Sequence, residues 1–142
     1  MVTPSRLPVA VLVFFLTACG SGISDKNLSY IDREVASLLI EGNTDTSPEI
    51  TATTVLVDSR QSWEFRKSHI PNSINIPFGR LRVQAWRLDN VKTIIVSGET
   101  QNDSVSIAMS KALLSMGFTD VKTLLGGFNG WEKAGKPIET AE

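Results

Sequence analysis

The sequence is poorest in cysteine, histidine and tyrosine, with one of each among its 142 residues. A single cysteine excludes an internal disulfide, so the fold must depend on its core alone. One histidine without a cysteine partner excludes the usual zinc centres, and we predict no metal and no cofactor. Clustered positive charge is missing as well, since 14 Lys and Arg are spread among 15 Asp and Glu for a net charge of -1. A nucleic-acid partner is therefore not predicted.

The most continuous apolar run lies near the N-terminus, from Leu7 to Leu16, and is interrupted only by Pro8. It is shorter than the roughly 20 residues that a membrane-spanning helix needs, so we interpret residues 1–18 as a secretory signal peptide. The last residues before the cysteine, together with Cys19 (LTAC), resemble the lipobox of bacterial lipoproteins. The resemblance implies that Cys19 becomes the mature N-terminus and carries acyl chains such as palmitate, which anchor it to the membrane.

The predicted organisation follows from this signal. Residues 19–27 form a lipidated cysteine and short polar tether, residues 28–138 one domain, and residues 139–142 a C-terminal tail. Gly20 takes the place of the aspartate that retains some lipoproteins at the inner membrane, so in a Gram-negative organism we expect the outer membrane. In any bacterial host the chain would lie on the periplasmic or extracytoplasmic side of the cell envelope. The alternatives are an ordinary secretory signal and an uncut N-terminal anchor.

Strand and helix patterns alternate through residues 28–138. Short β-branched or apolar runs predict strands at residues 53–58, 73–76, 93–96 and 121–124. Helical patterns cover residues 62–68, 80–88, 104–116 and 128–134. A further helix is predicted from an N-cap at Ser29 to Gly42, with Ile31, Val35, Leu38 and Leu39 on its buried face. Such alternation predicts an α/β fold, an open and mostly parallel sheet flanked by helices.

Three stretches of the sequence point to a family. DSRQSWEF (58–65), SHIPNSINIP (68–77) and LLGGFNGWEKAGKPI (124–138) resemble, in order and spacing, the signature stretches of rhodanese-like domains of the sulfurtransferase superfamily. The resemblance implies that the loop after the fourth strand opens with a catalytic cysteine and closes near an arginine. That cysteine takes up a sulfane sulfur as a persulfide and passes it to a thiophilic acceptor.

The corresponding stretch of this chain, TIIVSGETQNDSVSIA (93–108), contains neither cysteine nor arginine. Counted from the strand, Ser97 or Gly98 takes the cysteine position; counted back from Gly117, the position falls near Thr100. Sulfur transfer needs a thiolate, so we predict a catalytically inactive homologue that acts as a binding or scaffolding module, with a possible envelope protein as partner. The alternative is a thiosulfate or sulfane-sulfur transferase with an altered loop or a thiol borrowed from a partner.

The loop itself is also a candidate anion site. Backbone N–H groups and the start of the following helix favour an anion, while Glu99 and Asp103 oppose one, so weak binding is predicted. The candidate residues are Ser97, Gly98, Glu99, Thr100, Gln101, Asn102, Asp103 and Ser104.

The remaining residues of the signature stretches are predicted to be structural. Arg60 is expected to pair with Glu64, and His69 to be a turn residue rather than part of a serine triad with Ser97 and Asp58, because no glycine-flanked elbow surrounds Ser97. Trp86 lies beside Arg82 and Arg87, so an exposed position that serves a partner is the alternative to a place in the core. The predicted structural residues are Asp58, Arg60, His69, Pro71, Gly127 and Trp131, and Trp63, Phe65 and Trp131 are expected in the core.

Overall fold

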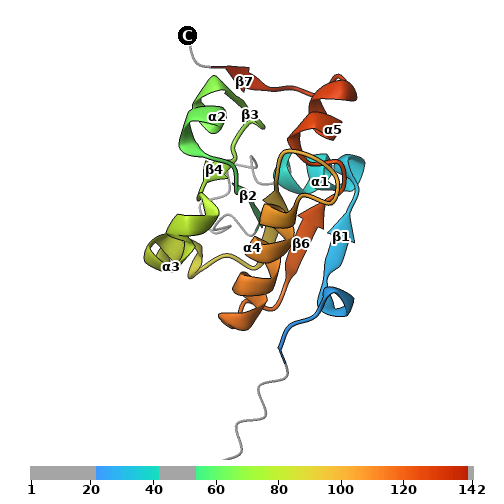
Figure 1. The fold of residues 1–142 in the computed structure, drawn as a ribbon. Helices are drawn as coiled ribbons and strands as arrows, with labels where there is room; N and C mark the ends of the chain where they lie inside the picture. Colours follow the sequence, from blue (N-terminus) through green and yellow to red (C-terminus); the bar gives the residue numbers. More distant parts are fainter. Residues whose placement is uncertain (1–21, 42–53, 141–142) are drawn as a thin grey trace, which may run out of the picture.

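The structure, a computed structural model, describes residues 22–41 and 54–140 (Figure 1). The predicted signal peptide and Cys19 lie outside the described residues. In the described part, no helix has the length and apolar character that crossing a membrane requires. The strands are β1 (Ser29–Ile31), β2 (Thr54–Asp58), β3 (Ser68–His69), β4 (Ile74–Asn75), β5 (Thr93–Ser97), β6 (Val121–Leu124) and β7 (Glu139–Thr140). The helices are α1 (Arg33–Glu41), α2 (Ser62–Lys67), α3 (Leu81–Gln84), α4 (Ser104–Ser115) and α5 (Gly127–Lys133), with 3₁₀ turns η1 (Asp25–Asn27), η3 (Phe78–Arg80) and η4 (Ala85–Leu88).

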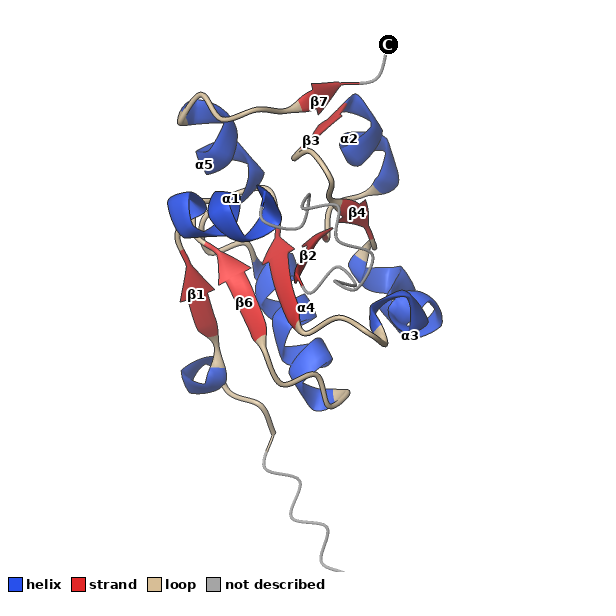
Figure 2. Ribbon diagram, turned by 180° about the vertical axis from the view of Figure 1, so that it is seen from behind, coloured by secondary structure: helices blue, strands red, loops and turns tan. Residues whose placement is uncertain are grey.

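Five strands form one parallel sheet in the order β1-β6-β5-β2-β4. Its two faces carry separate cores, one against α3 and α4 and the other against α1 and α5 (Figure 2). Along β5, Ile94 and Val96 pack into the first core and Ile95 into the second. Burial on both faces explains why β5 is apolar from Ile94 to Val96, and the arrangement confirms the predicted α/β fold with a mostly parallel sheet flanked by helices.

The N-terminal segment differs from the prediction. Residues 29–31 form strand β1 and pair in parallel with β6, and helix α1 begins only at Arg33. Asp32 caps this helix, since its Oδ1 accepts a hydrogen bond from Val35 N at 2.9 Å. The predicted face was wrong: α1 buries Ala36, Ser37 and Ile40, while Val35, Leu38 and Leu39 are exposed. Pairing of residues 29–31 with β6 at the sheet edge therefore determines where the helix begins.

Three smaller segments also differ from the sequence prediction. Glu139 and Thr140, assigned to the tail, form β7 and pair antiparallel with β3. Residues 25–27, assigned to the tether, form η1, and Asp25 makes an ion pair with Lys111 of α4. The single helix predicted at 80–88 is instead a series of short turns, η3, α3 and η4.

Candidate functional site

The loop between β5 and α4 lies at the carboxyl end of the sheet, where parallel α/β folds place their ligand sites. Ser97 is the last residue of β5 and stands opposite Asp58 of β2. The backbone N–H and hydroxyl of Ser59 both donate to the carbonyl oxygen of Ser97, each at 2.9 Å. Strand pairing therefore fixes the start of the loop, and Asp103 ends it as the N-cap of α4.

The carboxylate of Asp103 turns into its own loop. Its Oδ2 accepts a hydrogen bond from Glu99 N at 2.7 Å, and its Oδ1 accepts one from Val105 N at 2.7 Å. A Cβ atom built on Gly98 would lie only 2.3 Å from Asp103 Oδ2, so the carboxylate packs directly against that glycine. An external anion would have to displace this internal one. Weak anion binding at residues 97–104 stays a prediction.

The Ser97 side chain is closed off from solvent. Ser97 is 1% exposed, and its hydroxyl donates to the carbonyl oxygen of Gly98 at 3.2 Å. His69 lies elsewhere: its Nδ1 bonds the carbonyl oxygen of Phe65 at 2.9 Å and its Nε2 pairs with Glu139 at 3.0 Å. Asp58 is engaged by Arg60 instead. The three residues do not form a serine triad.

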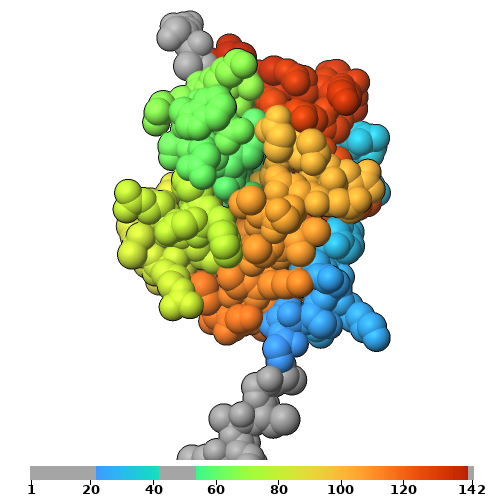
Figure 3. Space-filling view, viewed as in Figure 1, coloured from blue at the N-terminus to red at the C-terminus, as the bar shows by residue number. Residues whose placement is uncertain are grey.

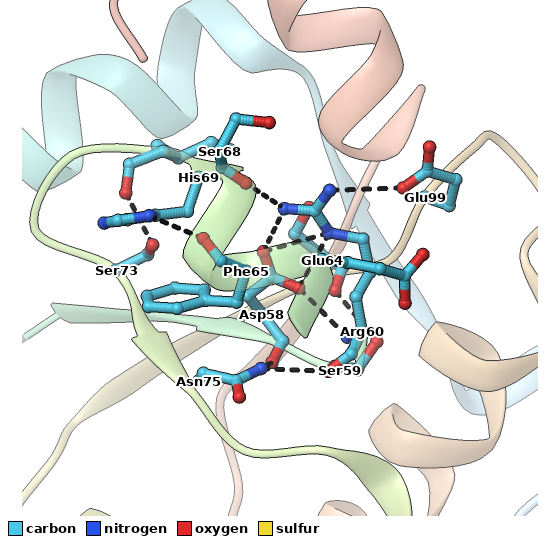
Figure 4. Close-up of polar contacts among 12 residues, drawn as sticks. Asp58, Ser59, Arg60, Glu64, Phe65, Ser68, His69, Ser73, Asn75 and Glu99 are labelled. Atoms are coloured by element: carbon cyan, nitrogen blue, oxygen red, sulfur yellow. Dashed lines mark hydrogen bonds and ion pairs between the residues drawn. The ribbon is translucent and has the colours of Figure 1, made fainter. Parts of the chain in front are cut away.

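Arg60 is the centre of the polar network beneath the loop (Figure 4). Its Nη2 donates to Asp58 Oδ2 at 2.7 Å and its Nε to both carboxylate oxygens at 3.1 Å. The same guanidinium donates to the carbonyl oxygen of Ser68 at 2.8 Å and pairs with Glu99 at 3.2 Å. It also lies 4.0 Å from the centre of the Phe128 ring, a cation–π contact.

The predicted Arg60–Glu64 pair was wrong. Glu64 Oε2 instead accepts a hydrogen bond from Gln61 N at 2.9 Å and caps α2. Burial of Arg60 opposes its charge, but hydrogen bonding and attraction from Asp58, and then from Glu99, outweigh burial and raise the pKa of Arg60. Because this cation is held by two carboxylates of the same chain, it is neutralised before any ligand arrives.

Helix α5 closes the site from the side opposite α4. Phe128 N donates to the carbonyl oxygen of Gly98 at 2.8 Å, and Asn129 N to that of Glu99 at 2.9 Å. Gly127 has a φ of 57°, and a Cβ there would lie 2.7 Å from the Gly98 carbonyl oxygen. Trp131 is buried, as expected, and its Nε1 donates to Pro137 O at 2.8 Å.

A hollow of about 240 Å³ opens beside Arg60, between α2 and α5. Trp63 lines it and is 62% exposed, so the prediction of a core residue was wrong. Phe65 is half-buried and stacks on His69, with ring centres 3.9 Å apart. Pro71 lies in the turn between β3 and β4. The hollow is lined by Arg60, Trp63, Glu64, Lys67, Ser68, Glu99, Phe128, Asn129 and Glu132.

Asn75 is a site residue that sequence reasoning missed. Its side-chain N–H groups donate to the carbonyl oxygens of Asp58 and Arg60, at 3.0 and 2.9 Å. This amide holds the turn that carries Arg60, and its place within a signature stretch was the only signal that could have found it.

Comparison with known proteins identifies the class. The sequence pattern of the family "Rhodanese-like domain" matches residues 34–134, so this chain belongs to the rhodanese-like domain family. Among its relatives are two proteins named thiosulfate sulfurtransferase GlpE. The one from Coxiella burnetii is 30% identical over 87 residues, covering 61% of this chain and 78% of that protein. The one from Pseudomonas savastanoi pv. phaseolicola is 34% identical over 88 residues, covering 62% and 80%.

Solved structures agree on the fold. The BH2092 protein of Bacillus halodurans matches with a TM-score of 0.65 and 25% identity, over 81% of this chain and 79% of that one. A thiosulfate sulfurtransferase of Pseudomonas aeruginosa matches with a TM-score of 0.65 and 23% identity, over 82% of this chain and 21% of that one. The second likeness concerns the fold alone, and both agree with one rhodanese-like domain.

Proposed function

We propose that this chain is a catalytically silent rhodanese-like domain, anchored by lipid on Cys19 to the extracytoplasmic side of a bacterial membrane, where it acts as a binding or scaffolding module. One observation carries the proposal: the loop after β5 begins with buried Ser97 and is filled by the carboxylate of Asp103. Cys19, the only cysteine of the sequence, belongs to the lipobox-like stretch rather than to the loop.

The chemistry of sulfur transfer supports this assignment. A persulfide forms on a thiolate, and a serine hydroxyl is far less acidic than the thiol with a pKa near 8.5. Two relatives are named thiosulfate sulfurtransferase, the activity that we propose this chain has lost. Here the negative charge that such a loop would stabilise is already supplied by Asp103.

We expect the purified chain to transfer no sulfur from thiosulfate to cyanide above a no-protein blank. Ser97→Cys alone is expected to restore little activity, because the Asp103 and Glu99 carboxylates disfavour a thiolate nearby. Thiocyanate formation, measured colorimetrically, checks both expectations.

The paired variant Ser97→Cys, Asp103→Ser is the control for the role of the carboxylate. Serine keeps an N-cap for α4 but leaves Glu99 N free to donate to the thiolate. The double variant should therefore form thiocyanate faster than Ser97→Cys alone. Turnover by the unaltered chain would overturn the proposal and favour the altered-loop enzyme. Robust turnover by Ser97→Cys alone would show that Asp103 does not obstruct the site.

The proposed anchor is tested separately in a bacterial host with the signal left in place. Labelled palmitate should be incorporated into the wild type and not into Cys19→Ser, which should also lose the processed lipoprotein form. A serine variant that is cut and sorted as the wild type is would make this a merely secreted protein. Fractionation of inner and outer membranes tests the proposed outer-membrane location in a Gram-negative host.

The hollow beside Trp63 is the surface we propose for an envelope protein partner. An exposed tryptophan next to a polar hollow has the composition of an interface anchor. The hollow lies at the carboxyl end of the sheet, next to the altered loop. The region that catalyses sulfur transfer in the family would therefore bind a partner protein in this chain.

A further inference from the structure

A second exposed surface combines apolar and basic side chains. Trp86 is 69% exposed and Val83 is 65% exposed, although both belong to short helical turns packed on the core. Phe78 and Met116 are also exposed, as are the arginines of the same segment. We call this the basic-apolar surface, formed by Phe78, Arg80, Arg82, Val83, Trp86, Arg87 and Met116.

The positive charge of this surface is largely uncompensated. Among the residues that the structure describes, Arg80 and Arg82 make no ion pair. Arg87 donates only to neutral groups, the carbonyl oxygen of Asn75 at 3.0 Å and the side chain of Gln84 at 3.1 Å. Asp89 is the exposed carboxylate at the end of the segment. Three arginines beside one acid favour an anionic partner.

The surface and the N-terminal end of the described domain lie on opposite sides of one helix. The surface contains a groove of about 720 Å³, lined by its Phe78, Arg82 and Met116 and by Ala112 and Ser115 of α4. On the other side of α4, Lys111 pairs with Asp25 of η1. In Figure 1 the described chain begins at the lower end of the domain, in blue, and α3 lies in the lower half on the left. In Figure 3 both segments reach the same visible face.

The length of chain before η1 limits how far the domain can lie from an anchor. Cys19 and Asp25 are six residues apart, which spans at most about 22 Å when fully extended. A lipid on Cys19 therefore holds the lower end of the domain within that distance of the bilayer. The basic-apolar surface lies in the same half of the molecule, so the tether keeps it close to the lipid headgroups.

We propose that the basic-apolar surface docks on an anionic membrane, as a second attachment beside the lipid on Cys19. This rests on the proposed anchor. Trp86 and Val83 would enter the boundary between headgroups and acyl chains, where tryptophan is favoured, and the arginines would lie at lipid phosphates. Two attachments hold a domain in one orientation, whereas a single tether does not. The hollow beside Trp63, at the other end of the sheet, would then face away from the membrane.

Tryptophan quenching by brominated acyl chains tests this orientation. The full chain is reconstituted in phosphatidylcholine vesicles with or without phosphatidylglycerol, both carrying brominated lipid. We expect quenching in the anionic vesicles that is lost in Trp86→Phe and retained in Trp63→Phe. The matched control is close, since both tryptophans are about two-thirds exposed and Trp131 is buried.

Charge reversal gives the second comparison. Arg80→Glu with Arg82→Glu should abolish most of the Trp86 quenching in anionic vesicles. Arg66→Glu with Lys67→Glu makes the same change of net charge on exposed residues of α2, and it should leave quenching unchanged.

The outcomes separate docking from anchoring. Quenching that does not depend on Trp86, that is equal in neutral vesicles, or that falls equally in both charge-reversed variants overturns docking. If a protein partner covers this surface instead, Trp86 stays unquenched, and docking is again overturned. If the chain is labelled with palmitate but Trp86 is not quenched, the lipid anchor is supported and membrane docking is overturned. If Trp86 is quenched but the chain takes up no palmitate, docking is supported and the anchor is overturned.

Discussion

Arg60→Met is expected to lower the free energy of unfolding by about 3–5 kcal/mol, because it leaves a buried carboxylate without its cation. Asp58 is buried at the end of β2, and its Oδ2 lies 2.7 Å from Arg60 Nη2. The variant also removes the hydrogen bond to Ser68 O and the contact with the Phe128 ring. Urea unfolding of the full chain, followed by circular dichroism, measures the change.

Two controls separate pair loss from side-chain loss. Arg66→Met removes an exposed arginine of α2 and should change stability by less than about 0.5 kcal/mol. Asp58→Asn combined with Arg60→Met removes both charges and should be more stable than Arg60→Met alone, since no charge stays buried and unpaired. If Arg60→Met unfolds at the same urea concentration as Arg66→Met, the buried pair does not support the loop.

The central strands of the sheet were predictable because burial on both faces requires a run of apolar residues in the sequence. A strand covered on both faces must be apolar at every position, as Thr54–Asp58 and Thr93–Ser97 nearly are, and such runs stand out from the turns around them. The first strand, Ser29–Ile31, has no such apolar run. It is three residues long, lies at the edge of the sheet and exposes two of its residues, so the helical spacing beyond it dominated the pattern.

The apolar face of α1 shows a different limit. Val35, Leu38 and Leu39 have helical spacing, yet the helix buries Ala36, Ser37 and Ile40. The direction in which a helix faces is set by what it packs on, and here small residues allow close approach to the sheet. Periodicity predicted that the helix exists but not its orientation.

The site was predictable in position but not in its polar contacts. Strand order places the loop after Ser97 at the carboxyl end of the sheet, and that follows from the alternating pattern. The contact between Arg60 and Glu99 joins residues 39 positions apart and depends on the side-chain path. The hydrogen bond from Glu99 N to Asp103 depends on Asn102, whose φ of 63° turns the loop back. Neither contact leaves a pattern in the sequence.

Gly127→Ala is the second large effect expected, because the loop and α5 touch at that residue. A Cβ there would lie 2.7 Å from the carbonyl oxygen of Gly98 and 2.9 Å from Thr100 N, which are backbone atoms that cannot rotate away. The φ of 57° adds the left-handed penalty of about 1–2 kcal/mol, and overpacking typically adds about 1–3 kcal/mol. The sum is about 2–5 kcal/mol of unfolding free energy.

Gly135→Ala is the matched control, because Gly135 also has a positive φ, 69°, but no atom lies within 4 Å of its added Cβ. It should lose only the left-handed penalty, about 1–2 kcal/mol, so the difference between the two variants isolates the contact with the loop. If α5 gives way in Gly127→Ala, the hydrogen bonds from Phe128 N and Asn129 N to the loop carbonyls are strained as well. Amide exchange at these two positions should then rise in Gly127→Ala and stay unchanged in Gly135→Ala. Equal unfolding midpoints for both variants would mean that the loop yields to the added methyl group, and the close contact between α5 and the loop would not be what holds the altered loop in place.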